Sequence, residues 1–188
     1  LTWNLDEIGI LTISGTGDMY DYSEEPAPWS EYSDIITSIT IDYGVTSIGT
    51  SAFTGCSNVQ QINIPDSVEH VDPYAFSFCK GLHTVKLPAS LTLISEDLFA
   101  ECANLKNIDI PGSVTEIGAN AFLRCTAFSL TELPDGIKSI GAAAKLGIFV
   151  KGEDCIESMA MAETMVFDKT GTITEGRYVI TDVFPVNM

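Results

Sequence analysis

Four cysteines stand at a constant interval of 23 residues, and this interval constrains the fold more than any other feature of the sequence. They are Cys56, Cys79, Cys102 and Cys125. Such a period is typical of a solenoid, in which each repeat covers the apolar face of its neighbour. Cysteines at one repeat position stack in a column, where their side chains run parallel instead of converging as a disulfide or a tetrahedral metal site requires. We therefore expect reduced, buried thiols that act as small apolar core residues.

The residues between the cysteines also repeat. Apolar residues recur at fixed positions of four units while the intervening positions vary, as a shared core with a solvated exterior requires. The alternating segment 61–64 (Gln-Ile-Asn-Ile) is typical of a short half-buried strand, which Pro65 ends. The stretch around Ala75-Phe76 lacks this alternation and fits a turn of helix with the aromatic ring inside. Strands of successive units are expected about 4.8 Å apart in one parallel sheet.

This repeat resembles the BspA-like branch of the leucine-rich repeat superfamily. The resemblance rests on the pattern Ile-x-Ile-Pro-x-x-Val-x-x-Ile-x-x-x-Ala-Phe-x-x-Cys-x-x-Leu and covers residues 36–141. It implies an α/β solenoid, that is, a leucine-rich-repeat superhelix of 23-residue coils with a parallel β-sheet on one face. It also implies a bacterial protein, secreted or held at the cell surface, that acts in adhesion or protein binding.

Residues 1–35 precede the repeats and are expected to form an N-terminal β cap. A solenoid needs such a cover because its first coil would otherwise expose a sheet edge and part of the core. The segment 11–15 (Leu-Thr-Ile-Ser-Gly) is typical of a strand and turn. Four aromatic residues are expected to be cap core rather than a ligand site: Trp3, Tyr20, Tyr22 and Trp29.

The acidic composition excludes several classes of partner. The chain has 26 acidic and 9 basic residues, a net charge of -17, and no Lys or Arg before Lys80. Such a surface repels nucleic acids and anionic membranes, so neither is an expected partner. No apolar run approaches the ~20 residues that span a bilayer, so no membrane insertion is expected. Without an initiating Met or a signal peptide, the chain is expected to be part of a longer protein.

The outward positions of the strands form the candidate ligand-binding surface. They vary from unit to unit and carry polar, hydrogen-bonding side chains of mixed charge, which suit a protein or glycan ligand. They are Gln61, Asn63, Thr84, Lys86, Asn107, Asp109, Leu130 and Glu132. At any single position the side chain can simply solvate the sheet, so the hypothesis concerns the surface as a whole.

No enzyme site, metal site or cofactor is expected in the repeats. His70 and His83 lie in different units and at different repeat positions, so they do not form a catalytic pair. The acidic residues of segment 18–25 lack the Asp-x-Asp-x-Asp-Gly spacing of a calcium loop. Cys155 lies outside the cysteine register and is expected to be exposed.

The repeat stops inside its fifth unit, where Ala144-Lys145 replaces the Ala-Phe pair and Ile148 replaces the cysteine. Residues 142–188 instead resemble a fragment of a heavy-metal-transporting P-type ATPase. The resemblance rests on segment 144–152 and on the motif Asp-Lys-Thr-Gly-Thr-Ile-Thr at 168–174. It implies that Asp168 is the aspartate that accepts the phosphoryl group. It places Lys169, Thr170 and Thr172 around the phosphate.

This fragment is expected to be an inactive relic. Phosphoryl transfer needs a metal ion and cationic groups in position. The later Gly-Asp-Gly-x-x-Asn-Asp segment of that family, which helps to supply them, does not occur here. The apolar segments 148–150, 165–167 and 178–180 are expected to add strands over the open C-terminal end of the solenoid, with a short helix at 153–161. The same strand edges would also allow self-association with a second copy.

Overall fold

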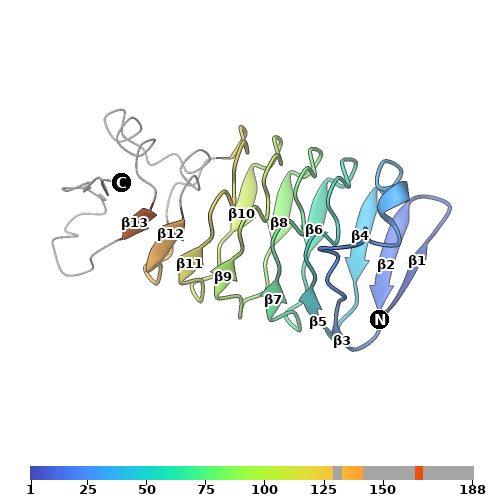
Figure 1. Cartoon of the computed structure of the whole chain (residues 1–188), viewed down its shortest axis with the longest axis horizontal. Coiled ribbons are helices and arrows are strands. Elements are labelled where there is room, and N and C mark those ends of the chain that lie inside the picture. The colour runs from blue at the N-terminus through green and yellow to red at the C-terminus, as the bar shows by residue number, and fades with distance from the viewer. Residues whose placement is uncertain (129–132, 142–163, 167–188) are drawn as a thin grey trace.

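The described residues of the computed structural model are 1–128, 133–141 and 164–166. They form an elongated solenoid whose coils follow one another along a single axis (Figure 1). Within these residues the regular elements are short β-strands and one 3-10 helix, η1 (Ser30–Tyr32). This confirms the solenoid that the 23-residue period predicts.

One column of strands follows the Ile-x-Ile positions of the repeat. β6 (Gln61–Asn63), β8 (Thr84–Lys86) and β10 (Asn107–Asp109) pair in parallel. Toward the N-terminus, β4 (Ser38–Ile41) lies beside β6 and pairs in parallel with β2 (Ile10–Ser14). Parallel strands therefore line one side of the solenoid as expected, but they form two hydrogen-bonded sheets, β1-β2-β4 and β6-β8-β10, instead of one.

A second column of strands was not anticipated from the sequence. It consists of β3 (Gly17–Asp18), β5 (Val45–Ile48), β7 (His70–Val71), β9 (Leu93–Ile94), β11 (Glu116–Ile117) and β12 (Ser139–Gly141). β3, β5 and β7 form one parallel sheet, and β9, β11 and β12 pair in parallel in another. Most of these strands are two residues long, which is too short for an alternating hydrophobic pattern to reveal them.

The expected helical turn around Ala75-Phe76 is wrong. An α-helix needs N–H groups that bond four residues back, but every second N–H here bonds to the next coil. The N–H groups of Tyr74, Phe76 and Phe78 donate to the carbonyls of Glu96, Leu98 and Ala100. The intervening N–H groups close turns of three residues, and the segment is a run of turns.

Left-handed backbone at two repeat positions also stops a helix from forming here. Tyr74 has φ 61° and Phe78 has φ 59°, and neighbouring coils have positive φ at the same positions. The first position is occupied by Ser51, Tyr74, Asp97 and Asn120, and the second by Gly55, Phe78, Glu101 and Arg124. A residue outside the α region interrupts helical bonding.

A stack of aromatic rings runs through the core along the solenoid axis. Neighbouring centroids are 4.6–5.9 Å apart and the planes differ by 9–22°. The members are Trp29, Phe53, Phe76, Phe99, Phe122 and Phe128, all buried. The two end members come from outside the Ala-Phe position: Trp29 from the cap, and Phe128 from the position that is Leu or Val in other coils. The stack therefore runs from Trp29 through four successive coils.

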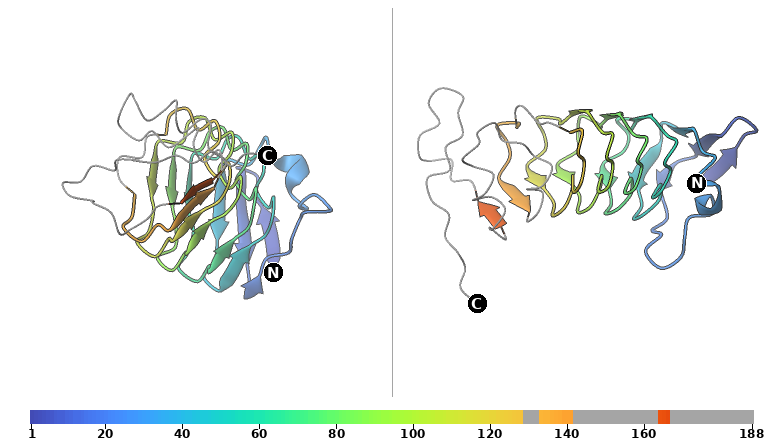
Figure 2. Two further views of the ribbon diagram at one scale, coloured as in Figure 1. Left: turned by 60° about the vertical axis from the view of Figure 1, so that its left-hand side comes forward. Right: turned by 90° about the horizontal axis from the view of Figure 1, so that it is seen from above.

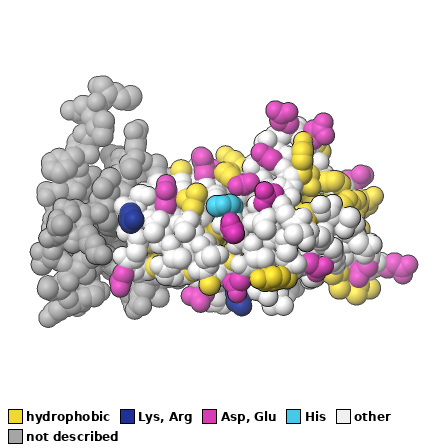
Figure 3. All heavy atoms as spheres, turned by 90° about the horizontal axis from the view of Figure 1, so that it is seen from below, with side chains coloured by type: hydrophobic (Ala, Val, Ile, Leu, Met, Phe, Trp, Pro, Cys, Tyr) yellow, Lys and Arg dark blue, Asp and Glu magenta, His cyan; other side chains and the backbone are white. Residues whose placement is uncertain are grey.

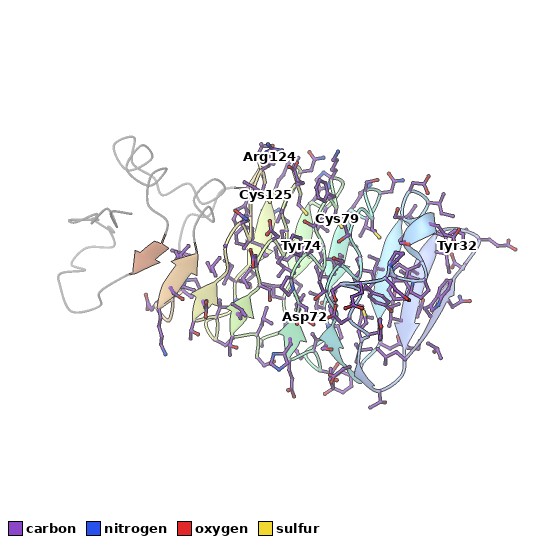
Figure 4. All side chains as sticks on the ribbon, in the orientation of Figure 1. Tyr32, Asp72, Tyr74, Cys79, Arg124 and Cys125 are labelled. Atoms are coloured by element: carbon purple, nitrogen blue, oxygen red, sulfur yellow. The ribbon has the colours of Figure 1, made fainter. Side chains whose placement is uncertain are left out.

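The four cysteines form the expected buried column of free thiols. Three of these thiols have a further role that the sequence did not indicate. Cys79 donates to the carbonyl of Phe53 at 3.2 Å, and Cys102 and Cys125 repeat this contact with Phe76 and Phe99. The side chains thus satisfy a buried backbone acceptor of the preceding coil. Figure 4 shows Cys79 and Cys125 on the same side of their coils.

The N-terminal end is closed by an antiparallel strand and a projecting segment. β1 (Thr2–Leu5) pairs with β2 as a hairpin at the outer edge of the first column. The segment between β3 and β4 contains η1 and projects from the side of the solenoid (Figure 2). Of the four cap aromatics, Trp29 is buried and Tyr22 packs against the core, whereas Trp3 and Tyr20 are exposed. The expectation of a buried cap core is therefore wrong for these two.

At the other end, one strand of the tail lies against the last coil. β13 (Thr164–Val166) pairs antiparallel with β12, with Ile140 opposite Met165. A strand of the tail that pairs with the last coil is what the hypothesis of a C-terminal cap requires. The C-terminal cap and the domain boundaries at 35/36 and 141/142 stay predictions. The expected strands at 148–150 and 178–180 and the helix at 153–161 lie outside the described residues.

We expect Phe99→Ala to lower the free energy of unfolding by about 3–5 kcal/mol, because it removes a buried ring from the middle of the stack. Urea unfolding followed by circular dichroism measures this. Phe78→Ala is the matched control, since Phe78 is 47% exposed and its loss should change the free energy by no more than about 0.5 kcal/mol. Equal effects of the two variants would contradict the role of the stack.

Candidate ligand-binding surface

Two parallel rows of polar side chains line the outer face of the first column. In the first row Gln61, Thr84 and Asn107 are register partners on β6, β8 and β10. In the second row the partners are Asn63, Lys86 and Asp109. All six are exposed, so the structure brings together every one of these predicted surface residues that it describes. We call them the polar rows.

The pleat of each strand fixes the outward direction of the polar rows. Successive side chains of a strand point to opposite faces. On β6 and β8 the central residues, Ile62 and Val85, are buried between exposed neighbours. A backbone bond from Ile64 N–H to the Lys86 carbonyl continues the ladder beyond the end of β6. Burial of the central apolar residue of each strand therefore directs its two polar neighbours outward, and the pairing of the strands aligns these side chains in rows.

Outward-facing polar side chains continue beyond β6 toward the N-terminus. Thr40 on β4 and Thr12 on β2 are register partners, and Thr40 stands 23 residues before Asn63. Thr40 is exposed and Thr12 half-buried. The repeat period itself could have found Thr40, whereas Thr12 lies 28 residues before Thr40, outside the period.

The two charges of the polar rows are adjacent and of opposite sign. Lys86 on β8 is the register partner of Asp109 on β10. Within the part of the chain that the structure describes, the single ion pair joins Arg124 to Glu101 at 2.7 Å, elsewhere on the coils. Neither Lys86 nor Asp109 is in an ion pair with another described residue, so both charges are available to a ligand. The remaining members are neutral amides and hydroxyls, which donate and accept hydrogen bonds.

The thiols are not nucleophiles. Burial raises the pKa of Cys56 and Cys125 to about 12, and it also raises the pKa of Cys79 and Cys102. The reactive form of cysteine is the thiolate, which these groups do not populate near neutral pH. The column is structural.

Other candidate groups do not assemble into a site. His70 is exposed on β7 and His83 is half-buried before β8, in different coils. Among the described residues no group of three His, Cys, Asp or Glu side chains could hold a metal ion. Leu130, Glu132, Cys155, Asp168, Lys169, Thr170 and Thr172 lie outside the described residues.

A model of the BspA type leucine rich repeat region matches residues 31–145 in six copies. The chain belongs to this family. The match covers all of the polar rows and the aromatic stack except its first ring, Trp29. The BspA-type repeat thus accounts for the described strands from β4 to β12, whereas β1, β2 and β3 precede it.

Solved structures of similar proteins agree with this assignment. The Treponema pallidum leucine-rich repeat protein is 29% identical with a TM-score of 0.55, over 73% of this chain and 70% of that one. A leucine-rich repeat protein from Bacteroides ovatus is 26% identical with a TM-score of 0.51, over 76% of this chain and 36% of that one. A leucine-rich cell surface protein from Faecalibacterium prausnitzii, 23% identical, shares the fold with a TM-score of 0.50 over 76% of this chain and 49% of that one.

A short stretch of the chain is similar to P-type ATPases. It is 47% identical over 45 residues to a zinc-transporting ATPase of Synechocystis, which is 24% of this chain and 6% of that protein. It is 43% identical over 44 residues to a probable copper-exporting P-type ATPase of Archaeoglobus fulgidus, which is 23% of this chain and 6% of that protein. The chain thus spans a small fraction of these curated relatives. In its described part, no helix is long and apolar enough to cross a membrane.

We expect iodoacetamide to leave the four column thiols of the native protein unmodified at mildly alkaline pH. Their raised pKa keeps the thiolate scarce, and their burial excludes the reagent. Peptide mass spectrometry after alkylation measures the modification of each thiol. In denaturing urea all four should react, which serves as the control. Rapid native modification of Cys79 would contradict the buried column.

Proposed function

We propose that this chain is a non-catalytic binding and adhesion module that recognises a protein or glycan ligand through the polar rows. The observation that carries this proposal is the geometry of the six exposed side chains on β6, β8 and β10. They form a ladder of hydrogen-bonding groups that a rigid core holds at strand spacing. A ligand therefore meets a preorganised surface and loses little binding energy to ordering it.

The family supports the same reading. Repeat solenoids present extended surfaces on which each coil contributes a few variable residues. Leucine-rich repeat proteins generally bind other proteins and are not generally catalytic. The polar rows vary in this way, since the first row reads Gln, Thr, Asn and the second Asn, Lys, Asp. We place the module on the bacterial cell surface or among secreted proteins, where an adhesion protein meets its ligand.

We expect an array of glycans and matrix proteins, probed with the whole chain, to identify a ligand. Lys86→Glu or Asp109→Lys should then weaken binding about tenfold, because each replaces an attraction by a repulsion of about 0.5–1 kcal/mol at an exposed site. Surface plasmon resonance measures the change in Kd.

Matched controls separate the surface from the net charge. Lys80→Glu changes an exposed lysine outside the strands, and Glu116→Lys changes an exposed carboxylate on β11 of the second column. Neither should alter Kd by more than about twofold. If the controls weaken binding as much as the row variants do, the polar rows are not the binding surface.

The second candidate function is that of a P-type ATPase relic, with Asp168 as phosphoryl acceptor. It is favoured by the local identity of 47% over 45 residues to a zinc-transporting ATPase. Phosphoryl transfer relies on metal ions and cationic groups that position and neutralise the phosphate. We propose that residues 142–188 by themselves are inactive, because the motif at 168–174 holds the phosphoryl acceptor but not the other groups that phosphoryl transfer needs.

We expect no change in intact mass when the chain is incubated with acetyl phosphate and Mg²⁺. A gain of one phosphoryl group that is lost in Asp168→Asn would contradict inactivity and favour the enzymatic reading. The same variant should leave ligand binding by the polar rows unchanged.

A further inference from the structure

Four aromatic rings form a continuous array at the N-terminal end of the solenoid. Trp3 lies 5.9 Å from Trp29 between ring centroids, Tyr22 lies 5.5 Å from Trp29, and Tyr20 lies 5.3 Å from Tyr22. All three pairs meet edge to face. Trp3 on β1 is the register partner of the buried Ile13, so it points to the interior side of the column. The aromatic array is therefore separate from the polar rows.

The array presents two open rings on a fixed support. Trp29 is buried, stacks on Phe53 and donates its Nε1–H to the carbonyl of Ala52 at 2.7 Å. Trp3 and Tyr20 at the two ends of the array are 41% and 67% exposed. Large exposed aromatic side chains on a rigid base are typical of binding surfaces.

Carboxylates are frequent in the part of the chain that carries the array, and Asp18 and Asp21 lie within two residues of Tyr20 in the sequence. Residues 1–79 contain twelve Asp and Glu and no Lys or Arg. Burial raises the pKa of Asp72, and the negative charge of Asp21 raises it further. The charge of Asp18 acts in the same direction, whereas His70 lowers the pKa, so the three carboxylates are near enough to interact. None of the three forms an ion pair with another described residue. Figure 3 shows acidic and hydrophobic side chains intermixed toward this end.

We propose that the aromatic array is a docking site for an arginine-rich segment of a partner protein. A guanidinium group over the face of Trp or Tyr is attracted by the ring quadrupole and stacks on the ring. The carboxylates around the array supply a negative potential that draws a cationic chain to it. An apolar partner would instead bury these carboxylates without counter-charges, which is unfavourable.

Fluorescence anisotropy of a labelled oligoarginine peptide with the whole chain tests this proposal. We expect Tyr20→Ala to weaken binding about threefold, the loss of one exposed cation–π contact. The double variant Trp3→Ala/Tyr20→Ala should weaken it about tenfold. Tyr43→Ala is the matched control, because Tyr43 is 82% exposed and takes part in none of the aromatic pairs. Its Kd should equal that of the unchanged chain.

Two further measurements separate the array from simple charge attraction. Asp21→Asn should weaken oligoarginine binding more than Glu116→Gln, which removes an equal charge from the second column. An oligolysine peptide of equal length should bind more weakly, because an ammonium is more strongly hydrated and does not stack. Equal Kd values for Tyr20→Ala and Tyr43→Ala, or for oligolysine and oligoarginine, would overturn the proposal. Circular dichroism verifies that each variant is folded.

Discussion

The structure depends on each coil sealing the apolar interior of its neighbour. A single coil of about 23 residues cannot bury its own hydrophobic face, so stability comes from the interfaces between coils. The aromatic stack from Trp29 to Phe128 is the most continuous of these interfaces. Backbone hydrogen bonds between the turns of successive coils, and hydrogen bonds from thiols to phenylalanine carbonyls, lie beside this stack. The apolar contacts and the hydrogen bonds of the buried polar groups therefore both run along the axis of the solenoid.

This sealing also determines where function can lie. Interior positions are committed to packing, so the variable side chains lie on the outside of the coils, and the outer face of the first column and the N-terminal end are two such places. The polar rows and the aromatic array differ in chemistry because they have different neighbours. The rows lie among strands of one sheet, whereas the array lies at the N-terminal end of the described solenoid, where Trp3 and Tyr20 are exposed.

The fold and the polar rows were largely predictable because both follow from a period. Gln61, Thr84 and Asn107 share one repeat position, and any residue at that position faces outward once its neighbours are buried. The turns were not predictable. Ala75-Phe76 has helix-compatible residues, but the left-handed backbone at Tyr74 and Phe78 and the bonds to the next coil decided against a helix. Those bonds form only when coils are stacked.

The sequence alone determined the repeat length, the buried cysteine column and the outward positions, because a repeated pattern needs only a shared core to explain it. Tertiary structure decided the second column of strands, the hydrogen bonds from thiols to the carbonyl of Phe53 and of the equivalent phenylalanines, and the exposure of Trp3 and Tyr20. The first two depend on contacts between residues at least 23 positions apart, and the third depends on which side chains the packed coils leave exposed. Such contacts leave no local pattern in the sequence.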